Sequence, residues 1–228
     1  MIIAIDGPAG SGKSTVAQKV AERLGFTYLD TGAMYRTVTL LAFEQGVSLE
    51  DDDALGGIAL EMDLHFEEDN GGLPRVFVGE REVTQDIRSP LVTQKVSLVS
   101  AHEKVRHALT LRQRRLAAEG NMVLEGRDIG TVVCPTAAVK VYLNASVEER
   151  ARRRQEQLEQ QGICISLKTL ERDLLLRDSY DSGRSLAPLR KAKDAVEMDT
   201  TNMSIEDVVN AVVAEVDRAR ERGTEGGC

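Results

Sequence analysis

Aromatic residues are scarce in this 228-residue sequence, which contains no tryptophan and only four tyrosines and four phenylalanines. Its formal net charge at pH 7 is −8. Proteins that bind nucleic acid polymers use a basic face and aromatic rings on which bases stack. The composition therefore argues against binding of DNA or RNA. With 42% hydrophobic residues, the chain has enough apolar side chains to form a buried core.

Cysteines and long apolar runs are also scarce. Cys134, Cys164 and Cys228 stand far apart and form no C-x-x-C pair, so neither a disulfide framework nor a zinc site is indicated. No run approaches the roughly eighteen apolar residues of a membrane-spanning helix, and the start MIIAID lacks the basic residues of a signal peptide. We therefore expect a cytoplasmic protein with no membrane partner.

Among the basic residues, arginine outnumbers lysine by 21 to 8. The planar guanidinium group binds a phosphate or carboxylate through two parallel hydrogen bonds, whereas lysine offers a point charge. The arginines are therefore the first place to look for a site that binds small anions.

Apolar runs alternate with helical patterns in the first and last parts of the chain. The runs at 2–6, 122–124 and 139–143 predict strands. Helices are expected from about 16 to 24, at about 32–45, from 147 to about 161, at about 167–177, and behind Ser204. Strands separated by helices predict a parallel α/β sheet, with ligands beyond the carboxyl ends of its strands. Ser146 and Glu149 have the spacing of a capping box at one helix start.

The pattern changes between about 62 and 83. Three short alternating stretches within 62–83, separated by turn residues, predict a small antiparallel sheet. Residues 91–118 are helical and strongly charged, and we expect two helices that meet near Ser100 to His102. We interpret the stretch at about 62–83 as an insertion into the parallel core.

A phosphate-binding loop follows the first predicted strand. The sequence GPAGSGKS matches G-x-x-x-x-G-K-[ST] and stands between a strand and a helix, as the mechanism requires. Its backbone N–H groups and the helix N-terminus face phosphates, Lys13 reaches the β- and γ-phosphates, and the Ser14 hydroxyl can hold Mg²⁺. The predicted nucleotide-binding residues are Gly7, Pro8, Ala9, Gly10, Ser11, Gly12, Lys13, Ser14 and Thr15.

A second substrate site is indicated by arginines near the ends of strands or beside acidic residues. Transfer of a phosphoryl group between two anions needs several fixed cations. Glu125, at the end of an apolar strand, is a candidate for supporting Mg²⁺ through water, although it can also be an ordinary strand-end carboxylate. No asparagine begins the N-K-x-D motif of guanine-specific GTPases. The candidate arginines are Arg36, Arg127, Arg177 and Arg184.

Taken together, the motifs resemble those of bacterial-type cytidylate kinases over nearly the whole chain. The resemblance rests on six ordered blocks: the phosphate-binding loop, DTGAMYR (30–36), VSLVSAHEKVR (96–106), EGRDIGTVV (125–133), ERARRR (149–154) and RDSYDSGRSLAPL (177–189). It implies transfer of the γ-phosphoryl group of ATP to CMP or dCMP, with Mg²⁺ as cofactor. It also implies a P-loop kinase fold, with a parallel sheet flanked by helices, a mixed α/β insert for the nucleoside monophosphate and a helical lid.

The resemblance divides the chain into a core (1–61, 117–155 and 186–222), an insert (62–116), a lid (156–185) and a tail (223–228). A monomer is expected. The family resemblance implies that Lys13, Arg127, Arg177 and Arg184 are catalytic. The acceptor phosphate would be held by Thr31, Arg36, Arg127 and Arg184. The cytosine would be read by Ser97, Arg106 and Asp128, and the sugar by Arg177 and Asp181.

Three further arginines share one face of the helix after residue 147, because Arg150, Arg153 and Arg154 follow the spacing i, i+3, i+4. They either meet the phosphates or adenine of ATP when the lid closes, or form a salt-bridged solvent-exposed face with Glu148, Glu149 and Glu156. Of the three, Arg154 is assigned to ATP.

Two other functions remain open on the sequence alone. One is a P-loop kinase for UMP or for a small acceptor that is not a nucleotide. The other is a nucleotide-dependent switch whose insert binds a protein. Ser97, Arg106 and Asp128 separate the first from a cytidylate kinase, because the N4 amine of cytosine suits a carboxylate acceptor. A switch would not release ADP when CMP is added.

Overall fold

The first apolar run forms the central strand of a five-stranded sheet. The computed structural model describes residues 1–67, 74–160 and 162–225. Strand β1 (Ile2–Asp6) pairs in parallel with β6 (Met122–Gly126) and with β7 (Val139–Asn144), and β7 pairs in parallel with β8 (Val196–Asp199). The strand order is β2-β6-β1-β7-β8, with β2 at Thr27–Asp30. The predicted parallel α/β core is confirmed.

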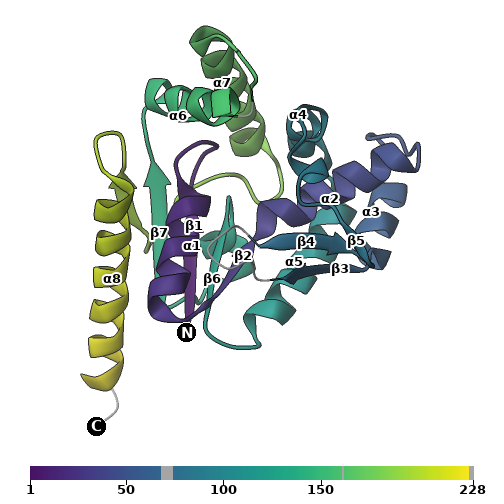
Figure 1. The fold of residues 1–228 in the computed structure, drawn as a ribbon. Helices are drawn as coiled ribbons and strands as arrows, with labels where there is room; N and C mark the ends of the chain where they lie inside the picture. Colours follow the sequence, from purple (N-terminus) through teal and green to yellow (C-terminus); the bar gives the residue numbers. More distant parts are fainter. Residues whose placement is uncertain (68–73, 161, 226–228) are drawn as a thin grey trace. The chain divides into compact units, whose positions relative to one another are not determined.

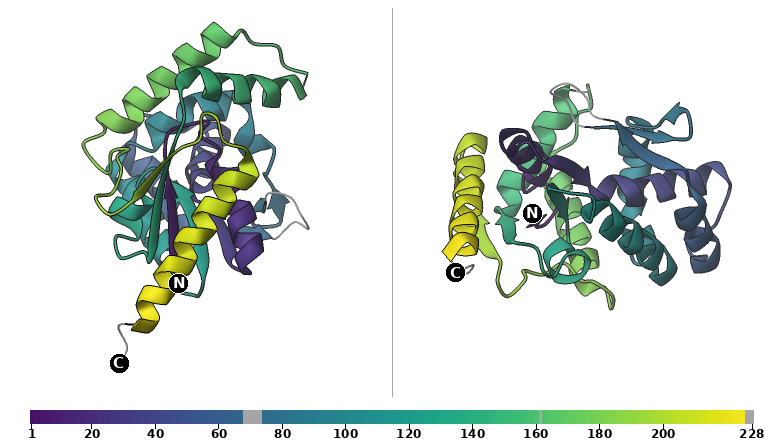
Figure 2. Two further views of the ribbon diagram at one scale, coloured as in Figure 1. Left: turned by 90° about the vertical axis from the view of Figure 1, so that its left-hand side faces the viewer. Right: turned by 90° about the horizontal axis from the view of Figure 1, so that it is seen from below.

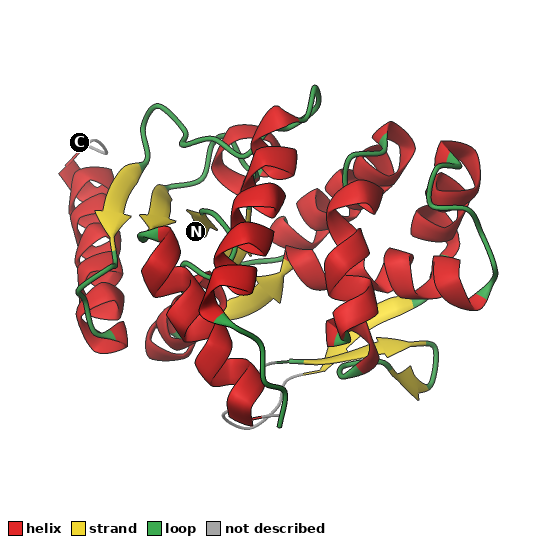
Figure 3. Cartoon of the chain, turned by 90° about the horizontal axis from the view of Figure 1, so that it is seen from above, coloured by secondary structure: helices red, strands yellow, loops and turns green. Residues whose placement is uncertain are grey.

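The chain separates into two compact units, Met1–Leu29 with Gly120–Cys228, and Asp30–Glu119. The helices of the first unit are α1 (Lys13–Leu24), α6 (Val147–Gln160), α7 (Leu167–Gly183) and α8 (Ile205–Glu225). Helices α1 and α8 pack against each other and share one apolar cluster with β1, β6 and β7 (Figures 1 and 2). Helices α6 and α7 form a pair beyond the carboxyl ends of the strands (Figures 1 and 3).

The second unit surrounds its own core, which includes Met34, Leu55, Ile87 and Leu109. Its elements are α2 (Thr31–Glu44), α3 (Asp52–Glu61), β3 (Leu64–Glu67), β4 (Arg75–Val78), β5 (Arg81–Glu82), a 3₁₀ turn η1 (Asp86–Arg88), α4 (Pro90–Val99) and α5 (Glu103–Ala117). Strands β3, β4 and β5 form an antiparallel sheet, and α4 and α5 are divided at 100–102. Both predictions for this region are confirmed. Residues 70–73 of the turn predicted at NGGLP (70–74) lie outside the described residues.

Several elements differ from the sequence predictions. Helix α7 continues to Gly183 instead of ending near Arg177, because polar side chains in its last turns form ion pairs with other elements. Helix α3, strand β8 and a five-residue π-helix η2 (Ile129–Val133) were not predicted. The glycine pair of α3 and the exposed residues of the edge strand β8 weaken the usual periodicity. Helix α8 extends into the predicted tail, as far as Glu225.

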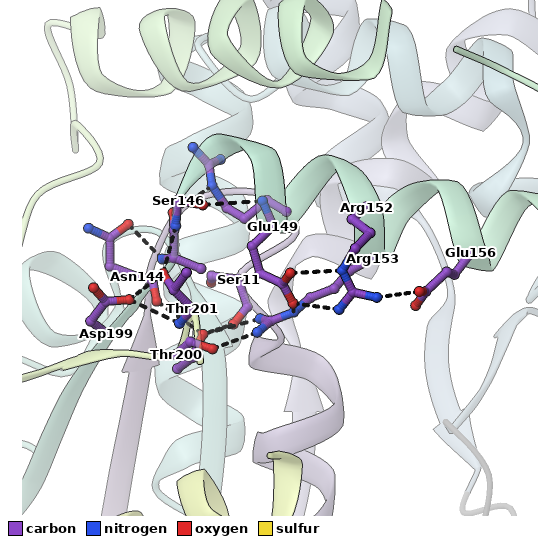
Figure 4. Close-up of polar contacts among 12 residues, drawn as sticks. Ser11, Asn144, Ser146, Glu149, Arg152, Arg153, Glu156, Asp199, Thr200 and Thr201 are labelled. Atoms are coloured by element: carbon purple, nitrogen blue, oxygen red, sulfur yellow. Dashed lines mark hydrogen bonds and ion pairs between the residues drawn. The ribbon is translucent and has the colours of Figure 1, made fainter. Parts of the chain in front are cut away.

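The predicted capping box at the start of α6 forms only in part. The Ser146 hydroxyl accepts a hydrogen bond from the Glu149 N–H at 3.2 Å, as expected. The Glu149 carboxylate does not return to the Ser146 N–H, which donates to Thr201 Oγ1 at 3.0 Å instead. Glu149 binds Arg152 and Arg153 (Figure 4), because the arginine-rich helix offers it stronger, charged donors.

No helix within the described ranges is long and apolar enough to cross a membrane. The predicted insert at 62–116 falls inside the second unit, and the predicted lid at 156–185 covers the end of α6 and α7. The boundaries of insert and lid stay predictions.

Candidate active site

The phosphate-binding loop connects β1 to α1 and depends on glycines at fixed points. Gly7, Gly10 and Gly12 all have positive φ values, of 151°, 78° and 88°. A Cβ atom on Gly7 would lie 2.0 Å from the main-chain oxygen of Leu143, in the neighbouring strand β7. The loop therefore follows a path that only glycine permits at Gly7, directly against the sheet.

Lys13 is the buried cation of this loop. Its Nζ donates to the Pro8 oxygen at 2.6 Å and lies 3.5 Å from Ser11 Oγ. Burial is the largest cause that lowers the pKa of Lys13, to about 7. Repulsion from Arg127 and Arg177 lowers this pKa further. Attraction to Glu125 and Asp6 raises it, but by less. The ammonium group is thus held where a negatively charged ligand would stabilise it strongly.

Three of the predicted site arginines converge on the buried carboxylate of Asp181, within the unit that carries the loop. Arg127 Nε lies 3.0 Å from Asp181 Oδ2, and Arg184 Nη1 lies 4.0 Å from Oδ1. Burial would raise the pKa of Asp181, but Arg127, Arg177 and Arg184 more than offset this and lower it. Burial likewise opposes the charge of Arg127, yet its acidic neighbours raise the Arg127 pKa. The result is a buried cluster with more arginines than carboxylates at its centre.

Asp6, which sequence reasoning missed, fixes the segment that follows Arg127. Its two carboxylate oxygens accept hydrogen bonds from the N–H groups of Ile129 and Gly130, both at 2.8 Å. Asp128 is buried at the start of the same π-helix. Burial raises the pKa of Asp6 to about 6, although these two hydrogen bonds act in the opposite direction. A carboxylate that ends an apolar strand, directly before a glycine loop, was the available signal.

The remaining predicted acceptor residues all belong to the second unit. Thr31 is buried at the first position of α2, and Ser97 is half-buried on α4. Arg36 donates to Thr93 Oγ1 at 2.8 Å. Arg106 is buried, donates to the Ser100 oxygen at 3.1 Å, and lies over the ring of Tyr35. Their assignment to a bound nucleotide stays a prediction.

Comparison with known proteins decides the family. The family profile described as cytidylate kinase matches residues 3–218. The chain belongs to the cytidylate kinase family. It is 50% identical to the cytidylate kinase of Exiguobacterium sibiricum over 91% of this chain and 92% of that protein. It is 51% identical to the cytidylate kinase of Halalkalibacterium halodurans over 95% of this chain and 97% of that protein. As a member of this family, the protein is a phosphotransferase.

A more distant likeness concerns the fold alone. A gluconokinase structure from Sinorhizobium meliloti 1021 superposes with a TM-score of 0.52 and 16% identity, covering 99% of this chain and 97% of that one. The two proteins thus share their fold, a parallel sheet flanked by helices, as the resemblance implied. The resemblance to cytidylate kinases inferred from the six motifs is confirmed.

In this cytidylate kinase family member, two oxygen-bearing side chains fit a hard cation. Ser14 lies in the first turn of α1, and Glu125 is buried at the end of β6, where Tyr28 Oη donates to its Oε1 at 2.6 Å. Among the described residues, no cluster of three or more His, Cys, Asp or Glu could hold a metal. Hydroxyl, carboxylate, phosphate and water oxygens are the ligands that Mg²⁺ prefers. The donor set is suited to a cation that arrives with a nucleotide.

Two of the three arginines on the predicted face of α6 form ion pairs with acidic side chains. Arg150 is buried and pairs with Asp178, whereas Arg153 pairs with Glu149 and donates to the Thr200 oxygen (Figure 4). A solvent-exposed face is therefore wrong for Arg150, because α7 and the phosphate-binding loop cover it. Arg154 is half-buried beside Gln157, and burial lowers its pKa.

The lowered pKa of Lys13 predicts proton uptake when ATP binds. At pH 8 most of the Lys13 side chain is neutral, and the negative charge of bound phosphates raises its pKa above the solution pH. We expect uptake of about one proton per ATP at pH 8 and much less at pH 6, where Lys13 is already protonated. Isothermal titration in buffers of different ionisation enthalpy measures this number. Equal uptake at both pH values, or none at pH 8, would contradict the expectation.

Proposed function

We propose that the protein transfers the γ-phosphoryl group of ATP to CMP and dCMP, with release of ADP and of CDP or dCDP. An oxygen of the acceptor phosphate attacks the γ-phosphorus while the bond to the ADP oxygen breaks. The acceptor phosphate is already an anion, so no general base is required. The observation that carries the proposal is the arginine cluster around Asp181, which belongs to the same unit as Lys13 and the phosphate-binding loop.

Electrostatic stabilisation of the transferring group is the main task of this site. Phosphoryl transfer spreads negative charge over the oxygens of the γ-phosphate, and fixed cations stabilise that charge without reorganising. Lys13 would act from the donor side, and Arg127, Arg177 and Arg184 from the acceptor side. Asp181 holds these arginines in place, as its contacts with Arg127 and Arg184 support.

The donor nucleotide would occupy the loop between β1 and α1. Its backbone N–H groups and the N-terminus of α1 favour the phosphates, with Arg154 assigned to the same nucleotide. Mg²⁺ is part of the proposal, and Ser14 would hold it directly and Glu125 through water. When bound, the cation would neutralise part of the charge on the donor phosphates.

The residues proposed to recognise the acceptor are those that the family resemblance implies. Thr31, Arg36, Arg127 and Arg184 would bind the acceptor phosphate. Ser97, Arg106 and Asp128 would read the cytosine, and Arg177 and Asp181 the sugar. The burial of Arg106 and Asp128 supports a reading role, because buried polar groups discriminate strongly against a base that leaves them without hydrogen bonds.

We further propose that the enzyme acts in the cytoplasm and as a monomer. Cys134 and Cys164 are both free thiols, as is usual in a reducing compartment.

A coupled assay of ADP release tests the proposed function. CMP, dCMP, UMP, AMP and no acceptor are compared at equal concentrations. We expect fast release with CMP and dCMP and slow release with the others. Equal rates with UMP and CMP would remove the assignment to cytosine, and no stimulation by any nucleotide would favour a switch or a kinase for another acceptor.

The Asp128→Ala variant tests how the base is read. The carboxylate of Asp128 would accept a hydrogen bond from the cytosine N4 amine and repel the uracil O4 carbonyl. Its loss should reduce the ratio of kcat/KM for CMP to kcat/KM for UMP by about tenfold or more. Asp173→Ala, at an exposed position of α7, is the matched control. An unchanged ratio in Asp128→Ala would reject the role in reading the base.

A further inference from the structure

A buried ion pair between α6 and α7 holds the phosphate-binding loop at Ala9. Arg150 Nη1 lies 2.6 Å from Asp178 Oδ2 and donates to the Ala9 oxygen at 3.0 Å. Asp178 Oδ1 accepts from the Ala9 N–H at 3.4 Å. The ion pair therefore binds both main-chain polar groups of one loop residue. Only 7% of the Arg150 side chain is exposed.

Three further observations show that α6, α7 and the phosphate-binding loop are tightly packed at this joint. Arg150 Nε donates to the Ala145 oxygen at 3.1 Å, just after β7 ends. A Cβ atom on Gly10 would lie 3.2 Å from Arg150 Cβ, so α6 and the loop approach each other closely. An apolar cluster fills the same joint, with Ala9 from the loop, Ala151 and Leu158 from α6, and Leu170 and Leu174 from α7.

The position of Asp178 on α7 connects this joint to the arginine cluster. Asp178 follows Arg177 directly and precedes Asp181 by about one helical turn. The contacts that hold Asp178 against the loop therefore also hold the part of α7 that carries Arg177 and Asp181. Arg184 follows at the end of the same helix, where its Nε donates to the main-chain oxygen of Asp181 at 3.2 Å.

We propose that Arg150 and Asp178 are positioning residues that fasten α7 to the phosphate-binding loop and so set the spacing between the donor phosphates and the arginine cluster. This inference rests on the proposed phosphoryl transfer. Catalysis is sensitive to such spacing, since a displacement of about 1 Å costs about a hundredfold in rate. The pair acts through other residues, because protein oxygens occupy the Nε and Nη1 groups of Arg150 in the joint.

The Asp178→Asn variant tests the proposal. It keeps the shape of the side chain but removes the charge that holds Arg150. We expect kcat to fall about tenfold or more, while KM for ATP and KM for CMP change by less than about twofold. Asp173→Asn is the matched control, since it makes the same substitution at an exposed site on the same helix and should leave kcat unchanged. Assays are run well below the melting temperatures of both variants.

A second variant covers the case in which Asp178→Asn does not fold. Arg150→Lys keeps the positive charge, but one ammonium group cannot reach all three oxygens that Arg150 binds. We expect a similar loss of kcat. If Arg150 and Asp178 position α7 together, the variant that combines Arg150→Lys with Asp178→Asn should lose little more activity than the worse single variant. Losses that multiply in the double variant would contradict the joint role.

Hydrogen exchange of the loop gives a readout that needs no turnover. Asp178→Asn should speed amide exchange in the peptide that contains Ala9, relative to Asp173→Asn, because the contacts of Ala9 with Arg150 and Asp178 weaken. Faster exchange with unchanged kcat would overturn the proposal, as would a raised KM for ATP with unchanged kcat, which indicates direct ATP contact. If the parent protein itself does not phosphorylate CMP, the proposed function fails, while the exchange experiment still tests the joint.

Discussion

The Lys13→Met variant is expected to lose about a thousandfold or more in kcat while the protein stays folded. Lys13 is the buried cation of the phosphate-binding loop, and methionine has a similar length but no charge. Removal of one preorganised group that stabilises transition-state charge usually costs a hundredfold to a thousandfold, and cations at a transferring phosphoryl group stand at the upper end of this range. The variant is measured by ADP release with saturating ATP and CMP.

Stability should change little in Lys13→Met, which separates the loss of catalysis from a loss of folding. Burial already makes the charged form of Lys13 costly in the free protein, as its lowered pKa shows. Replacing it with an apolar group should therefore shift the free energy of unfolding by no more than about 1 kcal/mol. Lys19→Met, on the exposed face of the same helix, is the control. A variant that keeps a tenth of the parent kcat would show that Lys13 does not act on the transferred group.

The Gly7→Ala variant is expected to have the largest effect on folding. Its Cβ would lie 2.0 Å from the Leu143 oxygen, a distance that requires the main chain of the loop or of β7 to move. Gly7 also has a φ of +151°, which residues with a Cβ rarely adopt. We expect a loss of more than about 4 kcal/mol in the free energy of unfolding, and no measurable ATP binding in any folded fraction.

Gly25→Ala separates backbone strain from the collision at Gly7. Gly25 also has a positive φ, of 66°, where it ends α1, but a Cβ atom added there would meet no other atom within 4 Å. Its substitution should cost only about 1 kcal/mol. Chemical denaturation of both variants measures the difference. Equal losses at Gly7 and Gly25 would show that conformational strain, and not the contact with Leu143, controls the loop.

Much of the fold and part of the site could be predicted because they depend on local patterns. The apolar runs locate the parallel strands, and the glycine motif locates the loop and Lys13. The prediction that Arg127, Arg177 and Arg184 serve one site is supported by their common neighbour Asp181. The roles of these residues toward bound substrates, and those of Arg36 and Arg106, stay predictions.

The features of the fold and site that were not predicted depend on tertiary contacts. The spacing of residues along the sequence does not encode such contacts. The spacing of Arg150, Arg153 and Arg154 shows that they share a helix face, but not that Asp178 and Ala9 lie opposite Arg150. Helix α7 extends through a polar segment of weak helix propensity because its acidic residues bind distant arginines. Asp6 was missed because its partners are main-chain N–H groups, which carry no signature in the sequence.

The register of the parallel sheet has a consequence for how the site tolerates change. Asp6 stands opposite Gly126 on one side and Tyr142 on the other, so the loop at Gly7 and the segment at Arg127 leave the sheet at one level. Main-chain hydrogen bonds set this alignment, and a side-chain substitution leaves them in place. A one-residue slip of β1 would instead move Asp6 and Gly7 past their partners and turn the strand's side chains to the opposite faces. The alignment of these two segments is thus insulated from most side-chain substitutions but exposed to insertions and deletions within the five residues of β1.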